Sequence, residues 1–193
     1  MDKRRFLTVA GIAAALPTHS QAAAPASAGS TLLTVSGAIG KDNRGALDPA
    51  LDQLMKKHGV KFDKAWTFDA AALARLPAVT IKPTIEYDAK QHSIQGPLLE
   101  TVLQAAGVAR DAKVLLGMRA IDGYNVMVSL ADARSYRMVV ATRMDGKSLP
   151  LGGLGPLWAT YDADNLPAFK DKPLKERFGL SPWGMYHIEV RPA

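Results

Sequence analysis

The sequence predicts an α+β domain that is mostly β with a few helices. Short runs rich in β-branched and apolar residues recur along the chain, and turn dipeptides such as Asp122-Gly123 and Asp145-Gly146 separate several of them. Helical patterns are few and short, and no internal repeat or linker divides the chain. Many short strands around a few helices are typical of this fold class.

The first 22 residues have the pattern of a signal peptide. Three cations precede an apolar run over residues 6–16, and Ser20-Gln21-Ala22 supplies the small-x-small spacing that signal peptidase accepts. The apolar run is shorter than the roughly 20 residues that cross a bilayer. Lys3 replaces the first arginine of a twin-arginine motif, so the sequence does not decide between export by the Sec pathway and export by the twin-arginine pathway.

We therefore expect cleavage after Ala22, with Ala24 as the alternative position. A disordered tether of small residues is expected over 23–30, followed by a single domain over 31–193. No later stretch is long and apolar enough to be a membrane span. The expected location of the domain is the periplasm.

The strand and helix pattern begins with a strand over 31–37, where β-forming residues end at a glycine. Two short helices are expected at 49–58 and 68–76, each ended by a glycine or a proline. Residues 79–87 are expected to form a strand, and Pro83 places it at an edge or a bulge.

The clearest helix opens at Gly96-Pro97, has one apolar face and ends at Gly107. A glycine-rich loop is expected at 149–155, before an aromatic segment. Four further strands are expected, at 113–119, 124–130, 137–144 and 185–190.

Composition excludes several classes of function. The net charge of +6 is spread along the chain, whereas nucleic-acid binding calls for a concentrated stripe of cations. The chain has no cysteine, which excludes thiol nucleophiles, iron–sulfur clusters and metals held by a thiolate.

The remaining motifs point away from hydrolysis. His58, His92 and His187 lack the spacing of a metal motif such as H-E-x-x-H, and no Gly-x-Ser-x-Gly elbow is present. The loop over 149–155 matches neither a P-loop nor a dinucleotide fingerprint. We expect surface or structural roles for these histidines.

Aromatic and charged residues gather instead at the predicted turns. Each has a structural alternative, since Trp158 can anchor the core and Asp145-Gly146 can be a hairpin turn. The candidates are Glu86, Tyr87, Asp88, Asp122, Tyr124, Arg143, Trp158 and Tyr161.

Over residues 32–162 the order of these pieces resembles the oxidoreductase molybdopterin-binding domain, which has the sulfite-oxidase fold. The resemblance covers most of the chain after the signal peptide. The matching words are Phe68-Asp69-x-x-x-Leu73-x-x-Leu76-Pro77, Gly96-Pro97-Leu98-Leu99, Asp122-Gly123-Tyr124, Ala141-x-Arg143-Met144-Asp145-Gly146 and Gly155-Pro156-Leu157-Trp158.

The chain departs from that family at the metal ligand. The family's enzymes hold molybdenum through a cysteine thiolate placed after the strand that precedes the Gly-Pro helix. Here that region reads Thr84-Ile85-Glu86-Tyr87-Asp88, and neither carboxylate nor phenol is equivalent to a soft thiolate. The resemblance therefore does not carry the enzymatic activity over, so the chain is expected to be a binding protein rather than an enzyme.

The sequence is similar to a cysteine-free branch of that fold, the PruR-like periplasmic proteins, which bind a free pterin. The resemblance implies a partner in the membrane, such as a cyclic-di-GMP enzyme or a sensor kinase. Two alternatives stay open. One is a molybdopterin-dependent oxidoreductase or carrier of the molybdenum cofactor, and the other is an interaction module without a ligand.

The chemistry of a pterin suits the candidate residues. Its 2-amino-4-oxo edge offers adjacent N–H donors that one carboxylate can accept, and aromatic rings can stack on its faces. Glu86 is the expected carboxylate, with Asp88 and Asp122 as alternatives, and Arg143 could reach the ring carbonyl or a phosphate. The expected binding residues are Glu86, Tyr87, Asp122, Tyr124, Arg143, Trp158 and Tyr161.

Two expectations concern the chain after Tyr161. The charged stretch over 167–178 is a candidate for a loop that faces a partner. We expect Trp183 to pack beneath the pocket rather than to line it.

Overall fold

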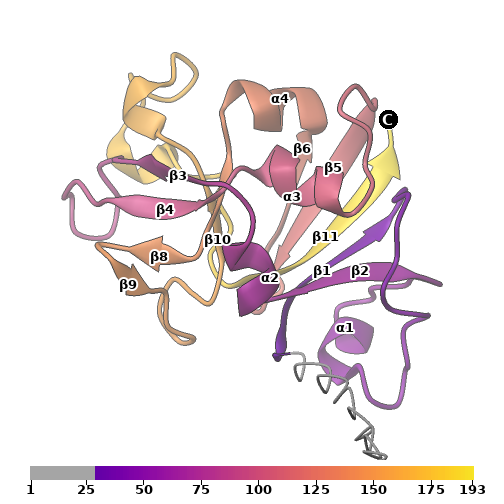
Figure 1. Ribbon diagram of the computed structural model, residues 1–193. Coiled ribbons are helices and arrows are strands. Elements are labelled where there is room, and N and C mark those ends of the chain that lie inside the picture. The colour runs from indigo at the N-terminus through magenta and orange to yellow at the C-terminus, as the bar shows by residue number, and fades with distance from the viewer. Residues whose placement is uncertain (1–28) are drawn as a thin grey trace, which may run out of the picture.

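A five-stranded sheet in the order β2-β1-β11-β5-β6 forms the centre of the molecule, which this computed structural model describes over residues 29–193 (Figure 1). Within this sheet β1 and β11 pair in parallel, and all other neighbouring strands are antiparallel. The strands are β1 (Thr31–Gly37), β2 (Ala65–Asp69), β5 (Val114–Ala120), β6 (Asn125–Ser129) and β11 (Met185–Pro192).

The predicted signal peptide and most of the predicted tether lie outside the described residues. Of the tether, Gly29 and Ser30 are described; both are exposed, and the Gly29 amide donates to Asp69. In the part of the chain that is described, no helix combines the length and the apolar character needed to cross a bilayer.

Alternation along β1 explains its central place. Leu33 and Val35 are fully buried in the core, whereas Ser36 points to the opposite face of the sheet. There the Ser36 hydroxyl lies 2.9 Å from Nε2 of His187 on β11. Phe62 stacks on His187, with ring centroids 6.4 Å apart, so the segment that includes α1 (Gln53–Lys57) seals this face.

Two helices pack together beside the sheet, α3 (Leu99–Ala105) and α4 (Leu130–Ser135). The apolar face predicted for the first is confirmed, since Leu99, Val102 and Leu103 are buried. The second was not predicted. It begins at the N-cap Ser129, whose hydroxyl accepts from the Asp132 amide at 2.9 Å.

A second sheet has the order β3-β4-β8-β9, with strands β3 (Ala78–Ile81), β4 (Ile94–Pro97), β8 (Arg143–Met144) and β9 (Lys147–Ser148). A separate pair joins β7 (Val139–Ala141) to β10 (Trp158–Thr160). Gly96 allows β4 and β7 to approach, because a Cβ there would collide with the Val140 carbonyl. Gly96-Pro97 therefore ends a strand and does not open the helix, which corrects the prediction.

Several predicted boundaries also need correction. The helix predicted at 68–76 is α2 (Ala70–Ala74), because Phe68 pairs in β2 and the Asp69 carboxylate caps the helix. The helix predicted at 49–58 is reduced to α1. The strand predicted at 79–87 ends at Ile81, ahead of Pro83, and the run at 137–144 divides into β7 and β8.

The remaining strand predictions are confirmed to within two residues. These are the runs that became β1, β5, β6 and β11. The turns at Asp122-Gly123 and Asp145-Gly146 also form, with positive φ angles of 93° at Gly123 and 76° at Gly146.

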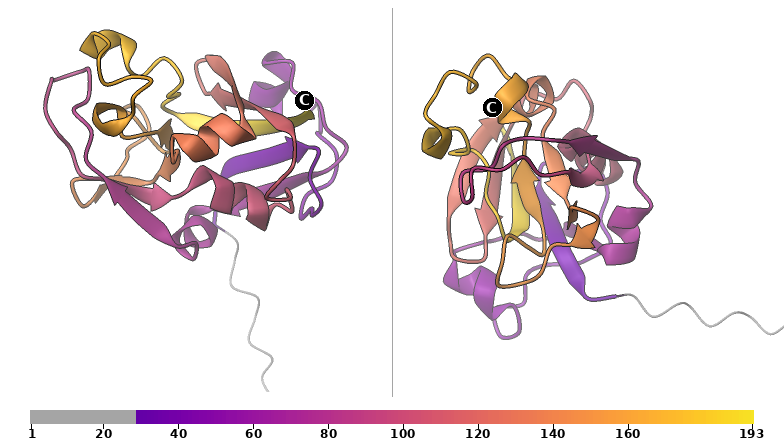
Figure 2. Two further views of the ribbon diagram at one scale, coloured as in Figure 1. Left: turned by 90° about the horizontal axis from the view of Figure 1, so that it is seen from above. Right: turned by 90° about the vertical axis from the view of Figure 1, so that its left-hand side faces the viewer.

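After β10 the chain forms an irregular segment with two 3₁₀ turns, at Ala163–Asn165 and Leu174–Glu176. In both Figure 1 and Figure 2 this segment lies at the far side of the molecule from α1. It lies beside the loop between β3 and β4, where the Asp164 carboxylate accepts from the Thr84 amide at 2.7 Å. These two segments form part of the site described next.

Candidate functional site

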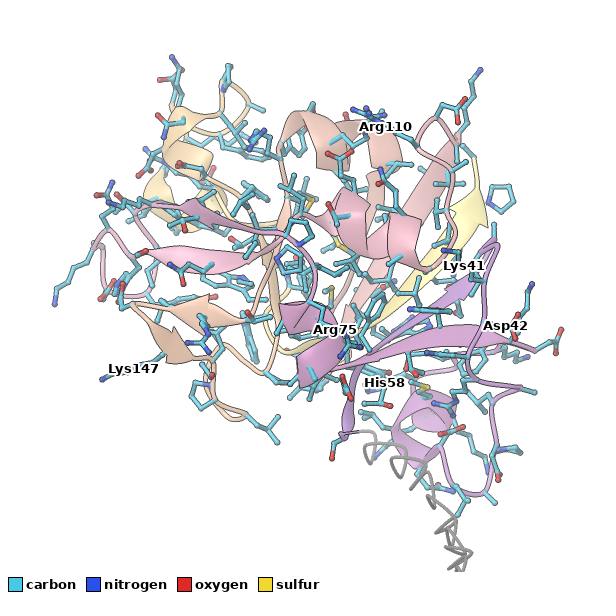
Figure 3. All side chains as sticks on the ribbon, in the orientation of Figure 1. Lys41, Asp42, His58, Arg75, Arg110 and Lys147 are labelled. Atoms are coloured by element: carbon cyan, nitrogen blue, oxygen red, sulfur yellow. The ribbon has the colours of Figure 1, made fainter. Side chains whose placement is uncertain are left out.

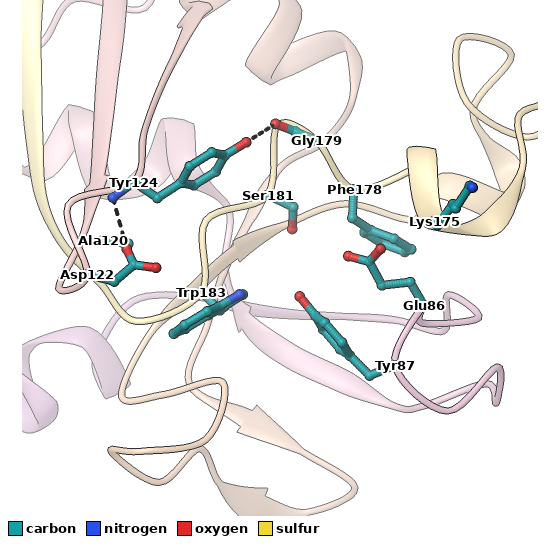
Figure 4. Close-up of a pocket in the computed structure, with 10 residues that line it drawn as sticks. All are labelled: Glu86, Tyr87, Ala120, Asp122, Tyr124, Lys175, Phe178, Gly179, Ser181 and Trp183. Atoms are coloured by element: carbon teal, nitrogen blue, oxygen red, sulfur yellow. Dashed lines mark hydrogen bonds between the residues drawn. The ribbon is translucent and has the colours of Figure 1, made fainter.

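A hollow of about 280 Å³ opens between three segments that are distant in sequence (Figure 4). They are the β3–β4 loop, the β5–β6 turn and the segment that leads into β11. The volume is near the lower end of the ~300–1,000 Å³ typical of small-molecule pockets. The lining residues are Glu86, Tyr87, Ala120, Asp122, Tyr124, Lys175, Phe178, Gly179, Ser181 and Trp183.

The β3–β4 loop contributes Glu86 and Tyr87. The adjoining Ile85 is 4% exposed and therefore anchors the loop in the core. Its amide donates to the Lys90 carbonyl at 3.0 Å, which closes a tight turn around the two pocket residues. Figure 4 shows the Glu86 carboxylate and the Tyr87 hydroxyl directed toward the hollow.

The β5–β6 turn contributes Asp122 and Tyr124. The Asp122 carboxylate accepts from the Tyr124 amide at 2.9 Å, and the intervening Gly123 has a φ of +93° that other residues rarely adopt. The Tyr124 hydroxyl donates to the Gly179 carbonyl at 2.8 Å, as the dashed line in Figure 4 marks. This bond joins the turn to the third segment.

The third segment is attached to β10 from behind. The Trp158 indole N–H donates to the Ser181 carbonyl at 3.1 Å, and the Ser181 hydroxyl donates to the Ala159 carbonyl at 2.7 Å. Trp183 pairs with Trp158 through an isolated backbone bridge. Trp158 is 1% exposed and lies in the core, while Trp183 is partly exposed and lines the hollow.

Tyr161 also lies behind the pocket wall rather than in the pocket. It is fully buried, its hydroxyl donates to the Arg177 carbonyl at 2.8 Å, and burial raises its pKa well above the usual value. Its ring stacks on Phe178 at 6.0 Å and on Phe169 at 4.6 Å. Tyr161 and Trp158 therefore pack behind Phe178, and Phe178 lines the hollow.

The hollow has both carboxylates and a cation. Glu86 and Asp122 enter from different segments, and Lys175 lies at the rim near Glu86 (Figure 4). Burial, followed by the neighbouring Glu86 charge, raises the pKa of Tyr87. Tyr87 is therefore a neutral donor at physiological pH, which suits it to bind an acceptor on a ligand.

The structure thus brings four of the predicted residues together: Glu86, Tyr87, Asp122 and Tyr124. Arg143 lines a separate hollow beside Leu32 and Leu149, and the Asp88 side chain contacts His92 instead of the pocket. Trp158 and Tyr161 lie in the core, as described above.

Three aromatic or charged residues line the hollow that were not among the predicted binding residues. Trp183 lines the pocket, which corrects the expectation that it packs beneath it, and Phe178 and Lys175 come from the stretch treated as a partner-facing loop. A signal was present, because Phe178 and Trp183 are aromatic residues in an irregular segment. Without the pairing of Trp158 with Trp183, however, nothing indicates which indole faces inward.

The residues of this chain do not fit a molybdenum held by a thiolate. The sequence has no cysteine, and the loop in question presents Glu86 and Tyr87. Within residues 29–193, no three side chains of the His, Asp and Glu types gather as a metal-ion site.

All three described histidines contact other side chains of the fold. The His58 Nδ1 lies 2.9 Å from the Tyr186 hydroxyl, and His92 lies between two aspartates. His187 is buried against Ser36, and this burial lowers its pKa to about 4.

Four of the cationic side chains can be located in Figure 3. Lys41, Arg75, Arg110 and Lys147, labelled in Figure 3, lie on well-separated parts of the molecule in that view. The figure therefore shows no basic stripe among these residues of the kind that nucleic acids require.

A scan of known protein families found no match, and no curated protein is similar in sequence. A solved structure is similar: the sulfane dehydrogenase SoxCD from Paracoccus pantotrophus, with a TM-score of 0.55 and 12% sequence identity. The match covers 83% of this chain but 38% of the other, so this chain spans less than two fifths of it. That enzyme is a sulfite-oxidase-family structure, and at this identity the likeness establishes that the chain has the sulfite-oxidase fold.

Proposed function

We propose that this protein binds a pterin without molybdenum in the hollow between the β3–β4 loop and the β5–β6 turn. The observation that carries the proposal is the grouping of three accessible aromatic rings and two carboxylates around one hollow. The rings are those of Tyr87, Tyr124 and Trp183, and the carboxylates are those of Glu86 and Asp122.

Each group has a role in binding a flat heterocycle. Glu86, the residue at the place of the family's thiolate, accepts the adjacent N–H donors of the 2-amino-4-oxo edge in a bidentate pair. Trp183 and Tyr124 stack on the ring faces, which contributes about 0.5–1.5 kcal/mol per pair beyond burial. Asp122 and the neutral Tyr87 bind polar groups at the remaining edge.

The proposed setting is the periplasm, where the protein senses the pterin and reports it to a membrane partner such as a cyclic-di-GMP enzyme or a sensor kinase. What supports this setting is the N-terminal pattern of a signal peptide. The alternative of a molybdopterin-dependent oxidoreductase is not better supported, because the chain lacks the cysteine that is its family's metal ligand.

We expect the purified protein to bind tetrahydrobiopterin under anaerobic conditions, and Glu86→Gln to weaken binding roughly 10- to 100-fold. The loss follows because a charge-assisted bond contributes about 1.5–3 kcal/mol. Isothermal titration calorimetry measures the dissociation constants. Arg143→Ala is the matched control, since it removes an exposed charge outside this hollow and should bind as the wild type does.

Thermal melting gives an independent test of ligand binding. A ligand at 100 times its dissociation constant adds roughly 2.7 kcal/mol to stability and so raises the melting temperature. If neither tetrahydrobiopterin nor neopterin raises the melting temperature, the hypothesis of an interaction module without a ligand replaces this proposal. Stoichiometric molybdenum in protein isolated from its native host would instead support the oxidoreductase.

A further inference from the structure

His92 connects the β3–β4 loop to the neighbouring β8–β9 turn. Its Nδ1 lies 2.6 Å from Oδ2 of Asp145 on the turn, and its Nε2 lies 3.1 Å from Oδ2 of Asp88 in the loop. The imidazole is mostly buried, with 16% of the side chain exposed. The Asp88 and Asp145 side chains are 39% and 52% exposed, so each contact is shielded from water on the imidazole side and open on the carboxylate side.

The two contacts constrain the protonation state of the ring. A carboxylate only accepts hydrogen bonds, and a neutral imidazole has a single N–H to donate. Only the imidazolium donates to Asp145 and Asp88 at the same time. The observed geometry is thus that of the charged ring, and one of the two bonds is lost when the ring is neutral.

This connection lies at one end of the loop that carries the pocket residues. The Ser93 amide donates to the same Asp145 carboxylate at 2.9 Å, and the Asp145 amide donates to the Ser93 carbonyl at 2.8 Å. With the contact to His92, Asp145 thus holds the C-terminal end of the loop through three bonds. The N-terminal end is held by the bond from the Thr84 amide to Asp164. Glu86 and Tyr87 lie between these two anchors, in a loop that is also closed by backbone bonds from Ile85 to Lys90 and from His92 to Pro83.

Opposing influences act on the pKa of the His92 ring. The bond to Asp145 raises the pKa of His92, burial opposes this, and the bond to Asp88 adds to it. Lys90 lies near Asp88, and Lys147 lies near Asp145. Both contacts are therefore made below the usual histidine pKa of about 6.5, and one of them is lost as the pH rises through the raised value.

We propose that His92 is a positioning residue of the pocket, whose imidazolium holds the β3–β4 loop against the β8–β9 turn so that Glu86 and Tyr87 face the ligand. Neutralisation of the ring as the pH rises breaks one of the two contacts, which loosens the loop and weakens binding. The effect on the ligand rests on the proposed function, whereas the contact that holds the loop is independent of it.

The loop is tested first without any ligand, by hydrogen exchange of single amides followed by NMR. The reporters are the amides of Ile85 and Ala89, which donate to the carbonyls of Lys90 and Ile85 inside the loop. We expect their protection factors, corrected for the intrinsic effect of pH, to fall roughly threefold to tenfold between pH 6 and pH 8.5.

Two aspartate variants form a matched pair for this experiment. Asp145→Asn removes the charge that joins the loop to the turn but keeps an acceptor for the Ser93 amide, and we expect low protection that no longer varies with pH. Asp88→Asn gives the neutral ring an amide N–H donor at Nε2, so both contacts form without the extra proton and the dependence on pH should weaken in this variant as well. A wild type with constant protection, or an Asp145→Asn variant with the wild-type dependence, overturns the proposal.

The second measurement is the dissociation constant of tetrahydrobiopterin over the same pH range. We expect it to rise by a similar factor in the wild type and to vary less in Asp145→Asn, where any ionisation of the ligand itself still contributes. If the wild type and Asp145→Asn bind tetrahydrobiopterin with the same pH dependence, the proposal that His92 affects ligand binding is overturned. No binding at any pH overturns the proposed function, and the loop contact is then decided by the protection factors alone.

Discussion

Replacement of Trp158 by alanine is expected to lower the free energy of unfolding by about 3–5 kcal/mol, the usual loss for a large aromatic residue in a core. The indole is 1% exposed and contacts Phe178, with ring centroids 6.2 Å apart. Its removal leaves a cavity, and it also leaves the buried Ser181 carbonyl without the donor it has at 3.1 Å. Urea unfolding followed by circular dichroism measures the change.

Trp183→Ala is the matched comparison, because it removes an indole that is partly exposed and lines the pocket. We expect a loss of stability of about 1 kcal/mol, together with impaired binding of tetrahydrobiopterin. Trp158→Phe should fall between the two, since it keeps most of the packing but loses the N–H donor. If Trp158→Ala were as stable as the wild type, the assignment of Trp158 to the core would be wrong.

Stability is expected to fall by about 3 kcal/mol between pH 6.5 and pH 4 because of His187. Burial against Phe62 and Ser36 lowers the pKa of this imidazole to about 4 in the folded protein. In the unfolded chain the pKa is near the usual 6.5, so between these values the unfolded state binds the extra proton. Acidification therefore favours unfolding through this range, and this group contributes no further change below it.

The measurement is the free energy of unfolding in urea at a series of pH values, for the wild type and His187→Gln. The variant cannot titrate at this position, so the difference between the two curves isolates His187 from the carboxylates and from His92. Ser36→Ala is the control, because it keeps the buried ring and should keep the dependence on pH. A wild type and a His187→Gln variant with parallel curves would contradict the shifted pKa.

Most of the central sheet could be predicted from the sequence because its signals are local. The β-forming runs at 31–37 and 185–190 are determined by the side chains within a few residues, and so is the Asp122-Gly123 turn between two β runs. The apolar face of α3 is equally local. These elements formed close to the predicted boundaries.

Other elements depended on partners far along the chain. Residues 65–69 form a strand because β1 pairs with them, although part of this segment reads as the start of a helix. Gly96-Pro97 resembles a helix start, yet pairing with β3 at Ala78 and Val79 places it in a strand. Pairing of this kind overrides local preference, because each backbone hydrogen bond of the sheet needs a partner that only the fold brings near.

The sequence by itself therefore determined the fold class, the absence of a thiolate ligand and the turn that carries Asp122 and Tyr124, whereas Glu86 and Tyr87 were predicted at the end of a strand and lie in a loop. Only the tertiary structure decided that this turn and this loop meet around one hollow, and which of two indoles faces it. Trp158 and Trp183 are paired across neighbouring segments, so one lies in the core and the other at the surface. Both residues are tryptophans, so their side-chain chemistry does not distinguish them. The position of each backbone segment in the fold decides which indole is buried.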